Sequence, residues 1–141
     1  MDDGSGRQPA IVVSACLLGV RCNHRGEANT SDAVLALRDT HRVIAVCPET
    51  MGGLPTPRVA AEIRSDGRVV NGAGDDVTIA FERGAAATVR VALVAGARDA
   101  VLKARSPSCD CRAGVTARAL REAGLDVRSE EDLGSTVRPT P

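Results

Sequence analysis

The sequence predicts a single α/β domain in which a mainly parallel sheet is flanked by helices, a Rossmann-like arrangement. Short β-branched apolar runs, typical of buried strands, alternate with longer stretches that repeat apolar residues at helical spacing. Strands that alternate with helices favour a parallel sheet covered on both faces. A length of 141 residues suits one domain with its own hydrophobic core, and no internal repeat or linker divides the chain.

The pattern places each element in turn. Strands are predicted at residues 10–15, 42–47, 99–104 and 125–129. Helices are predicted at residues 32–39, capped by Thr30 or Ser31, at 76–97, capped by Asp75 or Asp76 and ended by Gly96, and at 115–123, stopped by Gly124. A hairpin is expected around Asp66 and Gly67, whereas the prolines and glycines of residues 48–58 predict irregular structure. The domain therefore spans residues 10–133, between a disordered lead-in (1–9) and a frayed tail (134–141).

Composition argues against several classes of partner. The formal net charge is zero and Phe81 is the only aromatic residue, so the chain lacks both the basic surface and the stacking side chains that bind nucleic acid polymers. No apolar run approaches the roughly 20 residues of a membrane helix. The acidic N-terminal residues lack the pattern of a signal peptide, so we expect a cytoplasmic protein with neither nucleic acid polymer nor membrane as partner.

Three of the five cysteines follow predicted strands. Cys16 comes after the first strand, Cys47 closes the second, and Cys109 lies in the loop after the third. Parallel strands bring their carboxyl ends to one edge of the sheet, where ligands bind, so these cysteines are expected to converge. The spacing leaves several alternatives open. They are buried apolar cysteines, a zinc site, a redox pair, a thiolate nucleophile, and an iron–sulfur cluster with one iron unligated by protein.

Three segments carry a family resemblance. VSACLLGVRC (13–22), CPETMGGLPTPRVAAEI (47–63) and LKARSPSC (102–109) resemble the signature blocks of the domain-of-unknown-function 523 family, the TudS-like thiouracil desulfidases. The likeness continues through residues 74–87 and extends over most of residues 10–133.

Membership of that family implies an enzyme with a [4Fe–4S] cluster. Block by block, the resemblance assigns the cluster to Cys16, Cys47 and Cys109, with the fourth iron open. It implies non-redox removal of sulfur from a thiolated pyrimidine such as 2-thiouracil, giving the oxo base and hydrogen sulfide. Glu49 matches the catalytic acid/base of the family, and Ser106 matches a serine that assists it. The implied partner is a small thiolated nucleobase.

Other residues of these blocks are candidates for substrate binding. Paired Gly52 and Gly53 would let the backbone approach a ligand closely, and Arg58 would orient a substrate carbonyl or balance cluster charge. Ser108 is a further candidate. Without the resemblance, Glu49 and Arg58 would be read as exposed loop residues, and the serines as turn formers.

The chain also departs from the family pattern. Asn23–Gly26 replaces a common Arg-Tyr-Asp-Gly segment, and the short loop after Cys109 predicts a more open site. Cys22 is interpreted as structural or as a spare thiol, and Cys111 as a ligand of the fourth iron or a residue at the rim. Two rival functions follow: a non-catalytic iron–sulfur or metal-binding protein, and a thiol-based sulfur-transfer protein.

Overall fold

The computed structural model describes residues 8–110 and 114–134. In this part of the chain, the elements are, in order, β1 (Ala10–Ser14), η1 (Ala15–Leu18), α1 (Asp32–Leu35), η2 (Ala36–Asp39), β2 (Arg42–Val46), α2 (Pro48–Met51), β3 (Ala61–Ile63), β4 (Val69–Asn71), α3 (Thr78–Ala95), β5 (Asp99–Leu102), α4 (Val115–Glu122), β6 (Asp126–Ser129) and α5 (Glu130–Gly134). Four strands form a parallel sheet in the order β2-β1-β5-β6, as the alternation of elements predicts.

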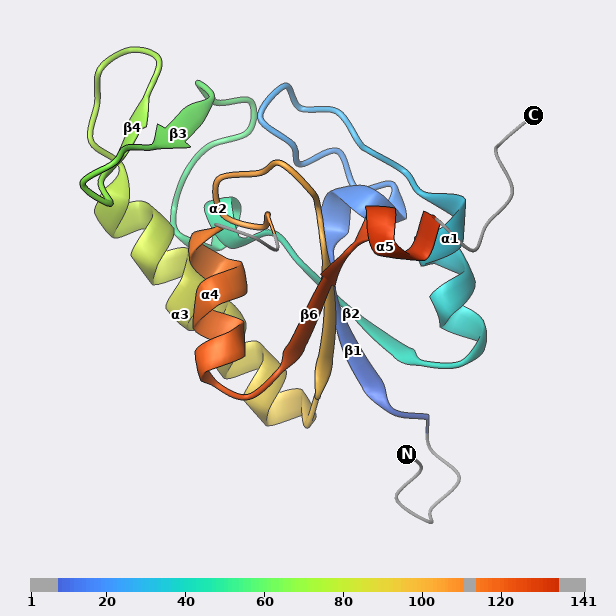
Figure 1. Cartoon of the computed structure of the whole chain (residues 1–141). Coiled ribbons are helices and arrows are strands. Elements are labelled where there is room, and N and C mark those ends of the chain that lie inside the picture. The colour runs from blue at the N-terminus through green and yellow to red at the C-terminus, as the bar shows by residue number, and fades with distance from the viewer. Residues whose placement is uncertain (1–7, 111–113, 135–141) are drawn as a thin grey trace.

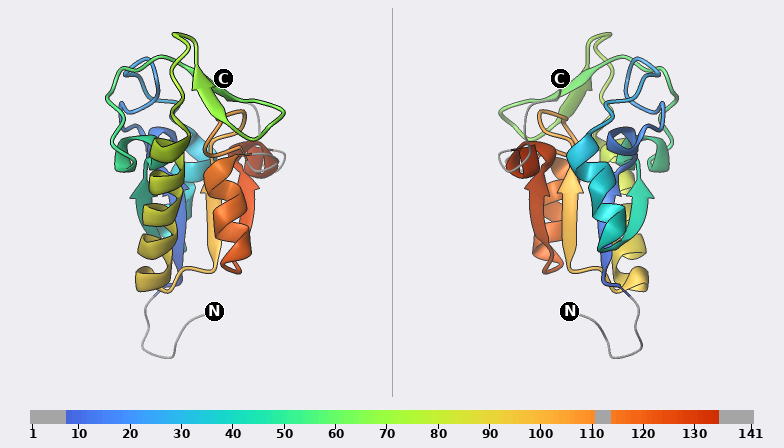
Figure 2. Two further views of the ribbon diagram at one scale, coloured as in Figure 1. Left: turned by 90° about the vertical axis from the view of Figure 1, so that its left-hand side faces the viewer. Right: turned by 90° about the vertical axis from the view of Figure 1, so that its right-hand side faces the viewer.

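Helices cover both faces of this sheet. α3 and α4 lie on one face, and α1 and α5 lie on the other (Figures 1 and 2). β1 contributes to both layers because successive side chains of a strand point to opposite faces. Ala10 and Val12 join the core that contains α3 and α4, whereas Ile11 and Val13 join the core that contains α1. Burial on both faces explains why β1 is an uninterrupted apolar run until its last residue.

The order of the strands sets where a ligand can bind. The connection from β1 to β2 passes through α1 on one face, and the connection from β5 to β6 passes through α4 on the other (Figure 2). The loops that leave neighbouring β1 and β5 therefore turn to opposite sides. Doubly wound α/β folds bind their ligands at such a point, beyond the carboxyl ends of the strands.

The predicted hairpin is present. β3 and β4 pair antiparallel with Ala61 opposite Asn71, and the turn between them contains Gly67 with a φ of 87°. In Figure 1 the hairpin lies beyond the carboxyl edge of the main sheet, above α3.

The ends of α1 and α3 follow the predicted caps with one difference. The hydroxyl of Ser31 accepts a hydrogen bond from the amide of Val34 at the start of α1. α3 ends at Gly96, which has a φ of 71°. α3 begins at Thr78, two residues later than predicted, and Asp76 Oδ1 accepts the amide of Thr78 at 3.0 Å.

Two short helices were not predicted. Residues 48–51 were expected to be irregular, but they form α2, with Pro48 in its first turn. Proline suits this position because its fixed φ is helical and its missing N–H has no intrahelical partner there. α5 follows β6 directly, where the predicted domain approaches its end.

Some expectations fall outside the described residues. The lead-in is described only at residues 8 and 9, and the tail only at residue 134, so the predicted domain limits stay a prediction. Cys111 is also outside the described residues. No helix in the described part has the length and apolar character needed to cross a bilayer.

Candidate active site

Cys16, Cys47 and Cys109 lie at the carboxyl ends of three neighbouring strands. Cys16 is in η1 directly after β1, Cys47 lies between β2 and α2, and Cys109 is in the turn after β5. All three line one cavity of about 340 Å³. The structure thus brings together the three cysteines that the sequence singles out.

The environment of these thiols suits metal ligation. Burial, and then the nearby Cys109 and Cys47, raise the pKa of Cys16 to about 12. Burial also raises the pKa of Cys109. A thiol in such surroundings becomes a thiolate when a cation holds it. Among the described residues, no three His, Cys, Asp or Glu side chains converge on a single ion. An iron–sulfur cluster does not need such convergence, because each thiolate binds a different iron.

Cys22 supplies a fourth thiol to the cavity wall. Its side chain is buried, and the Sγ of Cys47 donates to the carbonyl oxygen of Cys22 across 3.7 Å. Burial, and then neighbouring Cys47, raise the pKa of Cys22 to about 12. Cys22 therefore lies beside one of the three converging cysteines.

Glu49 and Arg58 form a partly buried ion pair at the cavity. Arg58 Nε donates to Glu49 Oε1 at 2.7 Å. The exposed fraction is 7% for the side chain of Arg58 and 14% for that of Glu49. Nη2 of Arg58 donates to the carbonyl of Cys22 at 2.9 Å, and Nη1 donates to Pro55 O and Thr56 Oγ1. Arg58 is therefore not an exposed loop residue. It fixes the carboxylate of Glu49 relative to two loops.

The second oxygen of Glu49 is bound by Ser108. Ser108 Oγ donates to Glu49 Oε2 at 3.1 Å and lies 3.2 Å from Ser106 Oγ. Ser106 Oγ also accepts the backbone amides of Ser108 and Cys109. Because this oxygen already accepts two amides, the proton of Ser106 is left for Ser108 Oγ. Ser106 therefore reaches Glu49 through Ser108.

Gly52 and Gly53 do not line the cavity. A Cβ at Gly52 would lie 2.0 Å from the carbonyl oxygen of Ala80, and a Cβ at Gly84 would lie 1.8 Å from that of Pro48. The two glycines Gly52 and Gly84 therefore let the backbones of α2 and α3 touch. The structure gives Gly52 a packing role in place of the substrate contact expected from the sequence.

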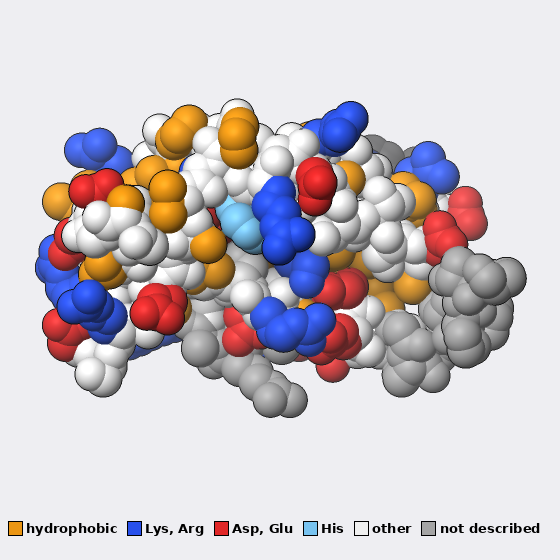
Figure 3. Space-filling view, turned by 90° about the horizontal axis from the view of Figure 1, so that it is seen from above, with side chains coloured by type: hydrophobic (Ala, Val, Ile, Leu, Met, Phe, Trp, Pro, Cys, Tyr) orange, Lys and Arg blue, Asp and Glu red, His pale blue; other side chains and the backbone are white. Residues whose placement is uncertain are grey.

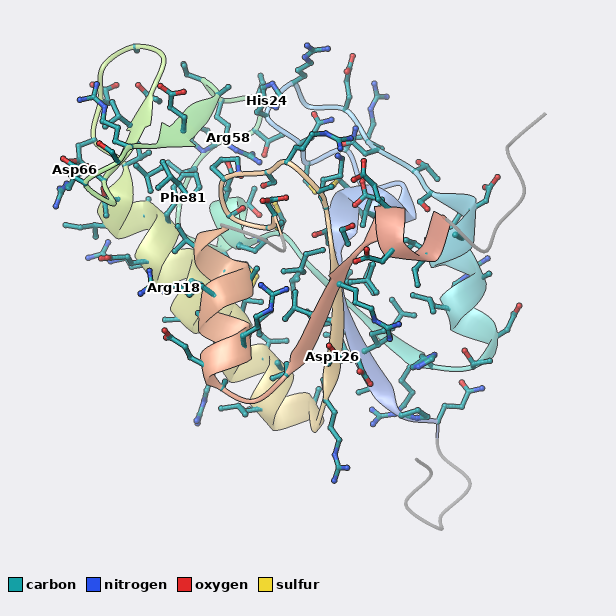
Figure 4. The ribbon with its side chains drawn as sticks, viewed as in Figure 1. His24, Arg58, Asp66, Phe81, Arg118 and Asp126 are labelled. Atoms are coloured by element: carbon teal, nitrogen blue, oxygen red, sulfur yellow. The ribbon has the colours of Figure 1, made fainter. Side chains whose placement is uncertain are left out.

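The loop that departs from the family pattern forms part of the rim. Asn23 Oδ1 accepts the amides of Arg25 and Glu27, which folds the loop into a compact turn. The amide of Arg58 donates to the carbonyl of His24, and the two residues lie close together above the sheet (Figure 4). Seen from above, Lys and Arg side chains gather beside a histidine near the middle of this face (Figure 3).

The segment just before Cys109 is hydrogen-bonded directly to the start of α4. The carbonyl of Ser108 accepts the amide of Thr116 at 2.7 Å, and the carbonyl of Pro107 accepts that of Val115. A Cβ at Gly114 would lie 2.6 Å from the oxygen of Ser108, so only glycine fits this turn. This arrangement holds Ser108 in place. The more open site expected from the short loop stays a prediction.

Three residues at the site were not predicted from the sequence. Ser14 and Lys103 line the cavity, and Glu130 Oε2 lies 3.3 Å from Lys103 Nζ. Glu130 Oε1 also accepts the amide of Ala104 at 2.7 Å. Glu130 belongs to α5, which was not predicted, so no signal pointed to it. The signal for Ser14 was a polar residue that ends an apolar strand.

Comparisons with known proteins agree with this arrangement. The 2-thiouracil desulfurase family matches residues 11–132. The uncharacterized protein YbbK of Bacillus subtilis (strain 168) is 34% identical over 150 residues, which cover 90% of this chain and 99% of YbbK. A solved structure described as the [4Fe-4S]-dependent thiouracil desulfidase TudS is 39% identical, with a TM-score of 0.82 over 91% of this chain and 95% of that one. The chain belongs to the 2-thiouracil desulfurase family.

Proposed function

We propose that this protein is a [4Fe–4S]-dependent desulfidase that converts a thiolated pyrimidine such as 2-thiouracil to the oxo base and hydrogen sulfide. The family match and the likeness to TudS support this activity. One observation carries it: Cys16, Cys47 and Cys109 line the same cavity as the fixed carboxylate of Glu49. A non-catalytic metal protein has no need of that carboxylate.

Cys16, Cys47 and Cys109 would hold the cluster. The three described side chains are free thiols on one cavity wall, and three thiolates are the donor set of a cluster with one iron open to a ligand. When bound, the cluster supplies a soft Lewis acid that matches a thiocarbonyl sulfur.

Glu49 is the base in this proposal. Each of its oxygens accepts one hydrogen bond, from Arg58 and from Ser108, and a carboxylate oxygen can accept another. Glu49 can therefore take a proton from a water that attacks the thiocarbonyl carbon. A C–O bond forms and the C–S bond breaks, so one water replaces sulfur and the overall reaction needs no oxidant or reductant.

The two serines hold the carboxylate in this role. The proton of Ser106 is directed to Ser108, and that of Ser108 to Glu49. Once Glu49 has taken a proton from the attacking water, it can return that proton to the departing sulfur. We assign Ser108 the direct contact with Glu49, and Ser106 a supporting role.

The substrate is a single small molecule in this proposal. A cavity of about 340 Å³ is at the lower end of the range for small-molecule sites, and because the cluster would fill part of it, the space left suits a ligand no larger than one small ring. We place the protein in the cytoplasm, because the four described cysteines are free thiols, as is usual in a reducing compartment.

Reconstitution tests the proposal. The purified chain is incubated with iron and sulfide without oxygen and then given 2-thiouracil, and uracil and released sulfide are measured. We expect the visible absorbance of an iron–sulfur cluster and uracil and sulfide in equal amounts. Failure to form a cluster, or a cluster without turnover, would overturn the proposal.

A pair of variants tests the base. Glu49→Gln keeps the size of the side chain and should lower turnover about 10²- to 10⁴-fold, the usual contribution of a general base, at unchanged cluster content. Glu27 also lines the cavity, so Glu27→Gln is the matched control and should keep most of the activity. Equal turnover in Glu49→Gln and the wild type would refute the role of Glu49.

A further inference from the structure

The segment after β5 contains an unusual backbone turn at Arg105. Its φ is 61°, and no other non-glycine residue in the described part of the chain has a positive φ. A Cβ disfavours this left-handed conformation by a factor of about ten. Such strain persists only where the surrounding structure holds it, and it is concentrated at functional sites. The turn directly precedes Ser106, so it sets the direction of the loop that carries Ser108 and Cys109.

Glu130 of α5 holds the backbone just before this turn. Glu130 Oε1 accepts the amide of Ala104 at 2.7 Å, and Glu130 Oε2 lies 3.3 Å from Lys103 Nζ. The side chain of Glu130 is 15% exposed and that of Lys103 is 23% exposed, so both charged groups are largely withdrawn from water. α5 lies beside the carboxyl end of β5 (Figure 1). A hydrogen bond to a charged carboxylate is stronger than one between neutral groups, so Glu130 can hold a strained turn.

The other contacts of this loop leave that task to Glu130. Asp110 Oδ1 accepts the amide of Arg105 at 3.0 Å, but Asp110 belongs to the same loop. The guanidinium of Arg105 pairs with Glu131, and both of these side chains are exposed, so the pair contributes little. The carbonyl of Ser108 accepts an amide of α4, which fixes the far side of the loop. Glu130 fixes the near side.

The position of this loop decides whether the hydroxyl of Ser108 reaches Glu49. Ser108 Oγ donates to Glu49 Oε2 at 3.1 Å, and Ser106 Oγ lies 3.2 Å from Ser108 Oγ. A shift of the loop by about 0.5 Å away from Glu49 would take the first of these contacts beyond the range of a hydrogen bond. The turn at Arg105 therefore bears on the carboxylate through Ser108.

We propose that Glu130 is a positioning residue for desulfidation, which holds Ala104 and Lys103 and so keeps the turn at Arg105 that directs Ser108 towards Glu49. This inference rests on the proposed function, because it takes Glu49 as the base. Glu130 does not line the cavity, so it would act on the reaction without touching the substrate.

Two variants of Glu130 test this role through the kcat for 2-thiouracil per bound cluster in the reconstituted protein. Glu130→Gln keeps an oxygen that can accept the amide of Ala104, so its kcat should stay near that of the wild type. Glu130→Met keeps the length of the side chain without that oxygen. Its kcat should fall about tenfold at unchanged KM, because the turn is then free to leave the left-handed conformation. Glu131→Met is the matched control on the same helix and should keep the wild-type kcat.

A double-variant cycle separates positioning from overall stability. Glycine adopts a positive φ freely, so in Arg105→Gly the turn no longer depends on Glu130. Glu130→Met should therefore lower kcat far less in the Arg105→Gly background than in the wild type. Equal losses in the two backgrounds, or equal kcat in Glu130→Met and Glu130→Gln, would overturn the inference. If Glu130→Met does not fold alone, the double variant decides, because a kcat well below that of Arg105→Gly, or a failure to fold, would overturn it.

Amide hydrogen exchange gives a readout that does not depend on turnover. Exchange at Ala104 and in the loop that follows should be faster in Glu130→Met than in the wild type, and unchanged in Glu131→Met. Unchanged exchange in Glu130→Met would overturn the inference. The proposed function fails separately, if the wild type forms no cluster or has no turnover.

Discussion

Ser108→Ala should slow desulfidation because Ser108 holds one oxygen of Glu49, the carboxylate that we propose as the base. The hydroxyl is buried and donates to Glu49 Oε2 at 3.1 Å. A hydrogen bond to a charged group contributes about 1.5–3 kcal/mol. If all of it is expressed in the transition state, at about 1.4 kcal/mol per tenfold change, kcat falls about 10- to 100-fold. The carboxylate keeps its bond to Arg58, so activity should not vanish.

The assay is the initial rate of sulfide release from 2-thiouracil, divided by the amount of bound cluster. Ser106→Ala is the informative comparison. Ser106 contacts Glu49 only through Ser108, and its oxygen accepts the amides of Ser108 and Cys109. Ser106→Ala should therefore reduce the amount of cluster held, with a smaller loss in rate per cluster. A rate per cluster that is lower in Ser106→Ala than in Ser108→Ala would refute this reasoning.

Three further predictions concern the frame around the site. Gly84→Ala should destabilise the fold by about 1–3 kcal/mol in urea unfolding, although alanine is the better helix former, because its Cβ would lie 1.8 Å from the oxygen of Pro48; a more stable variant would contradict the contact. Arg58→Ala should cost about 1–3 kcal/mol, because it leaves the partly buried carboxylate of Glu49 without its charged partner and with only the bond from Ser108 among those described here; an unchanged unfolding free energy would contradict this. Hydrogen bonds from Thr78, the first residue of α3, and then from Arg68 lower the pKa of Asp76 from 3.8 to about 2. Stability from this group is complete above about pH 4 and is lost as the pH falls towards 2, so Asp76→Asn should flatten that part of the profile, and identical slopes would contradict it.

The sequence was most informative where one physical rule decided the structure. Apolar β-branched runs can form only buried strands here, and parallel strands bring their carboxyl ends to one edge. The convergence of Cys16, Cys47 and Cys109 followed from that rule alone. Which metal centre they suit did not follow, because it depends on burial and on neighbours distant in sequence.

Contacts between segments distant in sequence could not be predicted. Gly52 was interpreted as a ligand contact, because the sequence does not reveal that Gly84 faces α2 across the helix pair. An isolated glycine inside a helix, such as Gly84, is the one available hint of such packing. Arg58 was expected to orient a substrate carbonyl or to balance the charge of the cluster. In the structure its guanidinium is bound to the carboxylate of Glu49. The contact between Ser108 and Glu49 likewise could not be predicted, because the two residues are 59 positions apart in the sequence.

Dependence of desulfidation on the cluster is tested most directly by comparing the reconstituted protein with its cluster-free form and with Cys16→Ser in one assay. Sulfide and uracil formed from 2-thiouracil are measured together with bound iron. We expect the wild type to bind a cluster and to release sulfide and uracil in equal amounts, and both other samples to release none. Equal sulfide release by the cluster-free protein, or a full cluster with no turnover, would contradict it.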